Sequence, residues 1–373
     1  MTASGRHAPF GLPGDALLDD GALAPGPHHQ EPPCRHFPEC GGCQLQHADD
    51  EAYRGYLVSR VETALAQHGL QTEMREPHLS PPYSRRRATL RALKVGSGAV
   101  LGFNAEKSHR IVDMRECHIL RPELFALVAP QRELLGGVLQ SKRAGEVQLV
   151  LIDQGVDVLI KGVQADGLAA MERLTAFAIH RRLARLSLDH GLGPETIFEP
   201  QPVTVTLSGT PVQFPVGAFL QATEDGEAVL AGCVREVVEG RIADLFSGLG
   251  TFALAVGADY AAEASRDAAA ALKRAAPRIE VEHRDLYRRP LDPAELGRFD
   301  SVVIDPPRAG AAEQARALAG SSVGRIAYVS CNPATFARDA RALTDGGYAL
   351  LWVRPVGQFR WSTHVELAAC FSR

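Results

Sequence analysis

The sequence predicts an α/β protein, with a mostly parallel sheet and flanking helices in the second half of the chain and a smaller α+β domain before it. Beyond residue 200, short apolar runs alternate with alanine-rich helical stretches, which is typical of parallel sheets covered on both faces. Helix and strand patterns mix between residues 34 and 200. The 373 residues suffice for two domains. We therefore expect boundaries at 1–33, 34–200 and 201–373.

The first two segments differ in their patterns. Residues 1–33 are rich in Gly, Pro, Ala and His, so we expect them to be extended or poorly ordered. Apolar side chains at helical spacing predict a helix over Tyr53–Gly69. Turn residues predict a hairpin within Ala88–Phe103 and a second pair of strands within Val147–Val163. Together these elements indicate an α+β domain.

Seven apolar runs predict the strands of the larger sheet. They are Ile242–Phe246, Tyr260–Ala264, Ile279–Glu282, Ser301–Ile304, Ile326–Ser330, Tyr348–Val353 and Val365–Phe371. The last two runs are separated by a loop and not by a helix, so we expect them to pair antiparallel.

Composition excludes some classes of protein. No run of 18 apolar residues occurs and no apolar leader opens the chain, so we expect a cytoplasmic protein without a membrane span. The net charge of −4 argues against nonspecific coating of nucleic acid, although it permits a local basic groove. Arginines cluster at 85–87 and at 181–185, and each cluster fits either a solvated face or a nucleic-acid contact.

A glycine-rich turn follows the first strand of the larger sheet. Asp244 precedes Gly248 and Gly250, and such a turn lets the backbone approach a ligand closely. Glu263 ends the second strand, where an acid can bind ribose hydroxyls, although a lone acid there is more often a surface residue. Asp285 follows the third strand, where it could accept from an adenine amino group. Because the third glycine of a dinucleotide site is absent, the pattern favours S-adenosylmethionine.

Three polar motifs end or open later strands, and parallel strands bring them to one edge of the sheet. They are Asp305-Pro306-Pro307-Arg308, Ser330-Cys331-Asn332-Pro333 and Thr363-His364-Val365-Glu366. A cysteine and a carboxylate together suit methylation of uracil at C5, because a thiolate can attack C6 and a base can then remove the C5 proton. Taken alone, Cys331 would more often be an inert buried thiol, and Asp305 and Arg308 could equally be structural turn and ion-pair residues.

Four segments in fixed order resemble the RNA uracil-C5 methyltransferase family, whose members act on ribosomal or transfer RNA. They are DLFSGLGTF (244–252), DPPRAG (305–310), SCNPATFARD (330–339) and HVE (364–366). Phe219-Leu220-Gln221 is similar to the glutamine motif of the family. The resemblance implies a Rossmann-like, seven-stranded class I methyltransferase domain that uses S-adenosylmethionine. It also implies that Cys331 is the nucleophile and Glu366 the base, and that Gln221, Phe246, Glu263 and Asp305 line the pocket.

Three residues depart from the family pattern. Ser247 stands where many members carry Cys, which keeps a small side chain. Thr223 replaces a frequent Asn, so contacts with the target base could differ. Gly357 replaces a frequent Asp, which puts the geometry of the loop before Glu366 in question.

Four of the seven cysteines form a second candidate site. An odd count and the absence of a leader argue against a disulfide framework. The ligand set would be Cys34, Cys40, Cys43 and the distant Cys117, and thiolates suit zinc and iron–sulfur clusters alike. The segment CRHFPECGGCQLQH (34–47) resembles the [4Fe–4S] site of the same family. The resemblance therefore implies a structural [4Fe–4S] cluster, with zinc as the alternative.

The resemblance also bears on the start of the chain and on the substrate. Many family members carry a β-barrel RNA-binding domain before the cluster, and residues 8–17 resemble only the end of one, so we expect no complete barrel. The C5 and C6 edges are hidden in a stacked base, so the enzyme must take a looped or single-stranded uridine and turn it out. We expect 23S ribosomal RNA, because the cysteine cluster is more typical of that branch, and we infer no obligate protein partner.

Three alternatives remain at this stage. A transfer RNA uracil-C5 methyltransferase would share every motif. A cytosine-C5 methyltransferase usually places its cysteine after a proline on an earlier strand, whereas Pro333 follows Cys331 here. A catalytically inactive RNA-binding iron–sulfur protein would keep the fold without methyl transfer.

Overall fold

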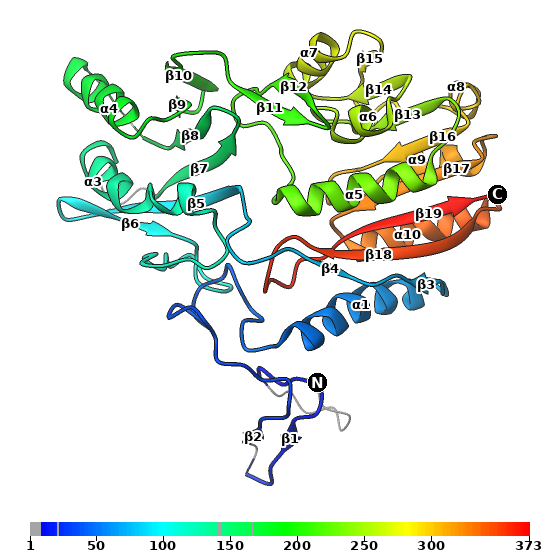
Figure 1. Ribbon diagram of the computed structural model, residues 1–373, viewed down its shortest axis with the longest axis horizontal. Coiled ribbons are helices and arrows are strands. Elements are labelled where there is room, and N and C mark those ends of the chain that lie inside the picture. Colours follow the sequence, from blue (N-terminus) through cyan, green and yellow to red (C-terminus); the bar gives the residue numbers. More distant parts are fainter. Residues whose placement is uncertain (1–8, 21, 140–143, 164, 166) are drawn as a thin grey trace.

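Two large sheets lie side by side in the computed structural model (Figure 1), which describes residues 9–20, 22–139, 144–163, 165 and 167–373. The larger sheet belongs mainly to the second half of the chain, and the smaller one to residues 87–198. No helix in these described ranges is long and apolar enough to cross a membrane.

The larger sheet has the strand order β15-β14-β13-β16-β17-β19-β18-β3, and β4 also pairs with β18. Its strands are β3 (Glu73–Met74), β4 (His78–Leu79), β13 (Ile242–Leu245), β14 (Tyr260–Glu263), β15 (Glu280–His283), β16 (Ser301–Ile304), β17 (Arg325–Ser330), β18 (Ala349–Gly357) and β19 (Glu366–Ser372). Only β19 runs against its neighbours β17 and β18, which confirms the predicted antiparallel pairing. All seven predicted strands are present, but the sheet has nine, because β3 and β4 extend it beyond β18.

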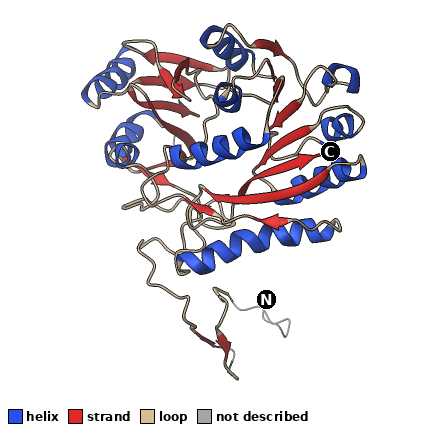
Figure 2. Ribbon diagram, turned by 45° about the vertical axis from the view of Figure 1, so that its right-hand side comes forward, coloured by secondary structure: helices blue, strands red, loops and turns tan. Residues whose placement is uncertain are grey.

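Helices cover both faces of this sheet (Figure 2). Along β16, Val302 and Ile304 face one core while Val303 faces the other, as the two-residue period of a strand requires. One face carries α5 (Glu224–Val237), α6 (Thr251–Val256) and α7 (Arg266–Ala275). The opposite face carries α1 (Asp50–Gln67), α8 (Pro293–Leu296), α9 (Ala312–Ala319) and α10 (Pro333–Asp345).

The smaller sheet has the order β10-β9-β8-β7-β5-β6, with only β8 and β9 parallel. Its strands are β5 (Arg87–Val95), β6 (Gly98–Gly102), β7 (Ala144–Ile152), β8 (Gly155–Lys161), β9 (Arg185–Asp189) and β10 (Pro194–Phe198). The helices α2 (Pro122–Phe125), α3 (Val128–Val138) and α4 (Leu168–His180) share a core with it. The predicted hairpins thus occur as β5–β6 and β7–β8.

The first helix joins the two halves of the chain. The carboxylate of Asp49 caps it by accepting from the Ala52 N–H at 2.8 Å. Its buried Tyr53, Leu57 and Val61 pack into the core of the larger sheet, although the predicted boundary assigns them to residues 34–200. That boundary therefore does not coincide with the cores.

Two short hairpins complete the described structure. They are β1 (Ala16–Leu17) with β2 (Leu23–Ala24), and β11 (Thr204–Leu207) with β12 (Thr210–Gln213). The first lies in the predicted irregular segment, of which residues 1–8 and 21 lie outside the described residues. The expectation of no complete barrel stays a prediction.

Candidate active site

The turn after β13 is built for close approach to a ligand. Phe246, Gly248 and Gly250 all have positive φ, at 62°, 55° and 90°. A Cβ on Gly250 would lie 2.4 Å from Leu272 Cδ1, so α6 can pack on α7 only with glycine there. A Cβ on Gly248 would meet nothing within 4 Å, which leaves open space beside that backbone. Phe246 holds a strained conformation that persists where the surroundings impose it, often at a functional site.

Glu263 and Asp285 lie on the loops beside this turn. Glu263 Oε2 accepts from the Gly248 N–H at 2.8 Å, and its other oxygen accepts from the Ser265 N–H at 2.6 Å. Asp285 Oδ1 accepts from the Tyr287 N–H at 3.0 Å. Both acids therefore stand at carboxyl ends of parallel strands, where open α/β sheets bind ligands.

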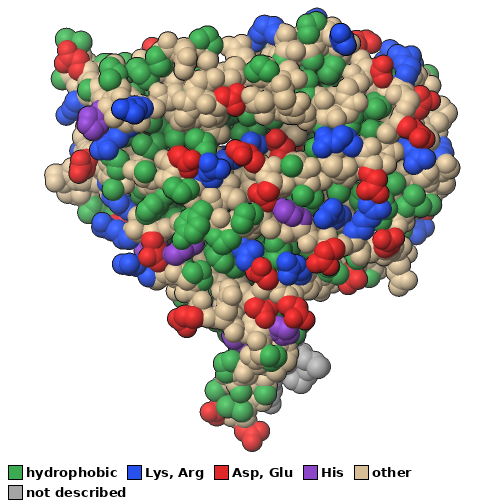
Figure 3. Space-filling view, in the orientation of Figure 1, with side chains coloured by type: hydrophobic (Ala, Val, Ile, Leu, Met, Phe, Trp, Pro, Cys, Tyr) green, Lys and Arg blue, Asp and Glu red, His purple; other side chains and the backbone are tan. Residues whose placement is uncertain are grey.

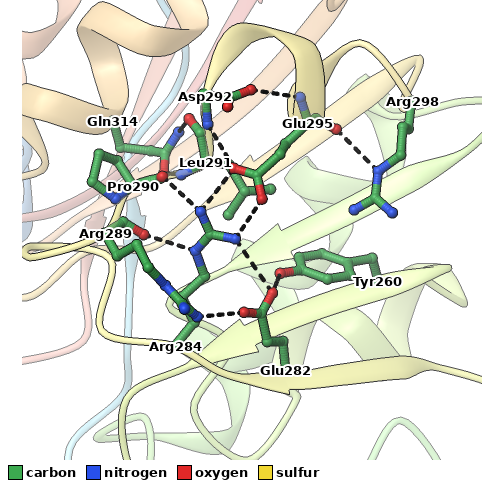
Figure 4. Close-up of polar contacts among 10 residues, drawn as sticks. All are labelled: Tyr260, Glu282, Arg284, Arg289, Pro290, Leu291, Asp292, Glu295, Arg298 and Gln314. Carbon is green, nitrogen blue, oxygen red and sulfur yellow. Dashed lines mark hydrogen bonds and ion pairs between the residues drawn. The ribbon is translucent and has the colours of Figure 1, made fainter.

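A buried arginine fixes the loop that carries Asp285, as Figure 4 shows. Arg284 donates to both carboxylate oxygens of Glu295 at 2.7 Å, and to the carbonyl oxygens of Arg289 and Pro290 at 2.7 and 2.8 Å. The guanidinium therefore closes the loop from inside, while the Asp285 carboxylate makes exposed contacts with the Tyr287 N–H and with Arg288.

Cys331 and Glu366 lie at the same end of two paired strands. Ser330 of β17 stands opposite Leu367 of β19, so the next residues along this antiparallel pair are Cys331 and Glu366. Glu366 is only 7% exposed. Burial raises the pKa of Glu366 to about 7, against the opposing effect of Arg87. Burial, together with the charges of Glu366 and Asp305, raises the pKa of the Cys331 thiol to about 11.

Asp305 completes this acidic group. It follows β16 directly, and its N–H donates to the carbonyl oxygen of Leu245 at 3.2 Å, beside the glycine-rich turn. Burial and the nearby Glu366 raise the pKa of the Asp305 carboxyl well above its usual range. The structure thus brings the thiol, the base and the aspartate together, as the three motifs predict.

Of the arginine cluster at 85–87, Arg86 is buried while Arg85 and Arg87 are partly exposed, so contact with nucleic acid at this cluster stays a prediction. Arg86 is 4% exposed and pairs with Glu227 at 2.6 Å. The guanidinium of Arg87 stacks 4.5 Å from the centre of the Phe219 ring. Burial lowers the pKa of Arg87 to about 10, while the charges of Glu366 and Cys331 oppose that shift. The charge of Arg87 therefore acts on Glu366 and Cys331.

Gln221 is held by a second buried amide. Gln358 Nε2 donates to Gln221 Oε1 at 2.8 Å, and Gln358 Oε1 accepts from the Ala222 N–H at 3.0 Å. This pairing ties the glutamine motif to the loop that precedes Glu366. Phe219, two residues earlier, is 60% exposed at the same place.

Two of the departures from the family pattern have local causes. Thr223 caps α5, because its Oγ1 accepts from the Gly226 N–H at 3.1 Å. A Cβ on Gly357 would lie 2.9 Å from Leu57 Cδ1 and 3.1 Å from Leu79 Cδ2, so an aspartate does not fit beside α1. The loop before Glu366 is therefore packed around glycine. Ser247 is buried, and its Oγ has no partner among the described residues.

The four candidate cysteine ligands line one enclosed cavity, together with Phe103, Met114 and other residues. Burial raises the pKa of Cys34 to about 11 and of Cys43 to about 12, and it raises those of Cys40 and Cys117 as well. Within the described ranges, no three His, Cys, Asp or Glu side chains are close enough to hold a single metal ion.

The cysteine loop also contacts the active-site loop. The N–H groups of Gln44 and Leu45 both donate to the carbonyl oxygen of Trp361, at 2.8 and 2.9 Å. Gln44 Oε1 accepts from the Thr363 N–H at 3.3 Å. Because Glu366 lies three residues after Thr363, these contacts connect the cysteine loop to the segment that leads into Glu366.

Proteins similar to this chain are named as RNA methyltransferases. A sequence model of the tRNA (uracil-5-)-methyltransferase family matches residues 281–373. An uncharacterized RNA methyltransferase of Zymomonas mobilis is 49% identical over 100% of this chain and 96% of its own length. A 23S rRNA (uracil(1939)-C(5))-methyltransferase of Thiobacillus denitrificans is 32% identical over 94% of this chain and 87% of its own length.

The chain belongs to the RNA uracil-C5 methyltransferase family.

The fold agrees with that membership. The crystal structure of the Pyrococcus abyssi tRNA (uracil-54, C5)-methyltransferase, in complex with S-adenosyl-L-homocysteine, superposes with a TM-score of 0.69. It covers 90% of this chain and 86% of its own length at 22% identity, which establishes a shared fold. The predicted class I methyltransferase domain and the predicted RNA uracil-C5 methyltransferase are thus confirmed.

Three residues of this methyltransferase site carry no clear sequence signal. Arg87 looks like part of a surface cluster, and its role depends on where β5 meets the larger sheet. Gln358 is an unremarkable loop residue until it pairs with Gln221. Tyr287 lies two residues after Asp285, where its ring centre is 5.6 Å from that of Phe246. The only sequence signal for Tyr287 is its position two residues after Asp285.

Proposed function

We propose that this protein transfers a methyl group from S-adenosylmethionine to C5 of a uridine in RNA, with Cys331 as nucleophile and Glu366 as base. One observation carries the proposal. The register of β17 and β19 sets the thiol beside the buried carboxyl, and burial tunes the pKa of that carboxyl to about 7. A base with that pKa is available at neutral pH.

The chemistry follows from these two groups. The Cys331 thiolate forms a bond to C6 of the uracil, and the electron pair of the C5–C6 double bond moves toward C5 and O4. When bound, S-adenosylmethionine would supply the electrophilic methyl group for C5 and would leave as S-adenosylhomocysteine. Glu366 then removes the proton from C5. The C6–sulfur bond breaks as the double bond re-forms, and the thiolate is released.

The surroundings of Cys331 set a condition on the first step. With a pKa of about 11 the thiol is protonated at neutral pH, so it must lose its proton as substrate binds. Glu366 and Asp305 raise its pKa, and Arg308 acts in the opposite direction. A positive charge brought close to the sulfur favours the thiolate, whereas exclusion of water alone disfavours it.

The cofactor pocket is formed by the loops after β13, β14, β15 and β16. We assign the ribose hydroxyls to Glu263 and the adenine amino group to Asp285. The open backbone at Gly248 and Gly250 admits the cofactor, and Phe246 packs on it. Gln221 and Asp305 lie between the cofactor and the target base. The assignments of Phe246, Glu263, Asp285 and Asp305 rest on their positions at the carboxyl ends of parallel strands, and that of Gln221 rests on the glutamine motif.

We propose that the cysteine cavity holds a [4Fe–4S] cluster, with zinc as the alternative. Four thiols around one cavity have the composition of a [4Fe–4S] ligand set. The cluster would be structural, since thiol-adduct chemistry needs no electrons. A visible absorption spectrum of anaerobically purified protein, with iron and zinc analysis, decides between the two.

The substrate is most simply 23S ribosomal RNA, with a looped or single-stranded uridine as target. The name of the Thiobacillus denitrificans relative supports this choice, and that of the Pyrococcus abyssi structure favours transfer RNA instead. In our proposal residues 34–200 hold the cluster and flanking RNA, residues 201–373 perform methyl transfer in the cytoplasm, and residues 1–33 are an accessory segment. Mapping 5-methyluridine in ribosomal and transfer RNA from a strain lacking the gene identifies the target.

Incubation of purified protein with labelled S-adenosylmethionine and total RNA tests the activity. Transfer should require Cys331 and be lost in Cys331→Ala. The matched control is Cys233→Ala, which alters a buried thiol in the core beneath α5. Full transfer by Cys331→Ala would contradict the assignment. No transfer by the wild type to any RNA would favour the inactive binding protein.

A further inference from the structure

We propose that Tyr287, Arg288, Arg308 and Arg338, which we call the arginine rim, form the surface that receives the single-stranded RNA next to the target uridine. This inference rests on the proposed function. It assigns a partner surface outside the pocket, in addition to the RNA contacts proposed for residues 34–200.

The rim surrounds the loop that carries Asp305. The Tyr287 hydroxyl donates to the carbonyl oxygen of Gly310 at 2.9 Å. From the other side, Arg338 donates to the carbonyl oxygen of Ala309 at 3.1 Å. Both side chains therefore meet the loop 305–310 from opposite directions. RNA on this surface would lie directly beside the catalytic loop.

Proximity to Cys331 is supported independently by charge. Arg308 lowers the pKa of the Cys331 thiol, and the Cys331 charge raises that of the Tyr287 hydroxyl after the larger effect of burial. The side chain of Asn332, next to Cys331, also donates to the carbonyl oxygen of Arg308 at 3.0 Å. The rim and the nucleophile thus share one edge of the sheet.

The side chains of the rim are accessible and suited to single-stranded RNA. Those of Arg288 and Arg338 are 89% and 43% exposed. Arg288 faces Asp285 at 3.4 Å, an exposed pair of little strength that can exchange for a phosphate contact. Tyr287 is 48% exposed and offers a ring on which a base can stack. Guanidinium groups around an aromatic ring are the usual means of holding a single strand.

On the face shown in Figure 3, basic and acidic side chains alternate and no large area has one sign. Arg181 and Arg182 form another exposed basic pair, but they follow α4 beside the smaller sheet. They make a matched control, because they carry the same charge without adjoining the catalytic loop.

Fluorescence anisotropy with a labelled oligouridylate tests the proposal. A length of about 12 nucleotides falls within the usual site sizes of single-strand binding proteins. The double variant Arg288→Gln/Arg338→Gln should bind about tenfold more weakly, with a salt slope smaller by about 0.7 for each lost phosphate contact. Tyr287→Ala should weaken binding while Tyr287→Phe retains it. Arg181→Gln/Arg182→Gln should bind like the wild type.

A second readout separates failure of the rim from failure of the proposed function. Wild-type protein should form a covalent complex with 5-fluorouridine RNA in the presence of S-adenosylmethionine; absence of that complex would contradict the proposed function. If the complex forms but Arg288→Gln, Tyr287→Ala and the double variant bind oligouridylate with wild-type affinity and salt slope, the rim proposal is wrong. Because Arg338 also pairs with the buried Asp339, the Arg288→Gln and Tyr287→Ala variants decide the result if the double variant melts early.

Discussion

The step that resolves the covalent adduct should depend on pH through Glu366 alone. Because the base acts in its ionised form, a raised pKa moves its activity to higher pH. With a pKa of about 7, Glu366 is about 9% ionised at pH 6 and about 91% at pH 8. The structure therefore predicts that resolution is about tenfold faster at pH 8 than at pH 6. An unperturbed glutamate, with a pKa of about 4.3, would give an almost flat profile over this interval.

A single-turnover assay isolates this step. The methylated adduct is formed first, the pH is then changed, and release of free RNA from the protein is followed on a denaturing gel. Adduct formation itself requires the Cys331 thiolate, so the steady-state rate would mix both groups, whereas release needs only the base. Glu366→Gln should release RNA roughly 100- to 10,000-fold more slowly and lose the pH dependence. A flat wild-type profile between pH 6 and pH 8 would refute the reasoning about the buried carboxyl.

Three further outcomes follow from the geometry. Arg87→Gln removes the charge that holds down the pKa of Glu366, so the release profile should shift to higher pH; an unchanged profile would contradict the contact. Gly250→Ala forces a methyl group against α7 at a position with positive φ, so it should lower the free energy of unfolding by roughly 1–3 kcal/mol in a denaturant titration. Gly248→Ala should cost less stability, but it should weaken the binding of S-adenosylmethionine, which calorimetry measures. Removing one ligand with Cys117→Ser should abolish visible absorption and speed proteolysis near residue 361. Unchanged absorption together with an unchanged rate of proteolysis would argue against the cluster.

The larger sheet could be predicted because its signals are local. Each of its seven main strands is a short apolar run, and the helices between them show their own period. β3 and β4 contain two residues each and carry no such signal, since they form only when α1 packs on the sheet. A boundary drawn from composition at residue 200 could not reveal that packing.

The proposed catalytic pair was accessible to sequence reasoning for a related reason. Cys331 and Glu366 end and begin paired strands, so topology alone brings them together. Arg87 was not accessible, because three consecutive arginines look like a solvated patch until β5 is placed against the larger sheet. The tightness around Gly357 was hidden as well, because the side chains that fill its space come from α1 and β4.

Mass spectrometry of the covalent complex tests the central claim most directly. Fluorine at C5 of 5-fluorouridine cannot be removed as a proton, so the adduct persists after methyl transfer. The account predicts that the nucleotide is found on the peptide containing Cys331, with the added methyl group. Attachment to any other residue, or methylated RNA that forms without ever binding Cys331, would contradict it.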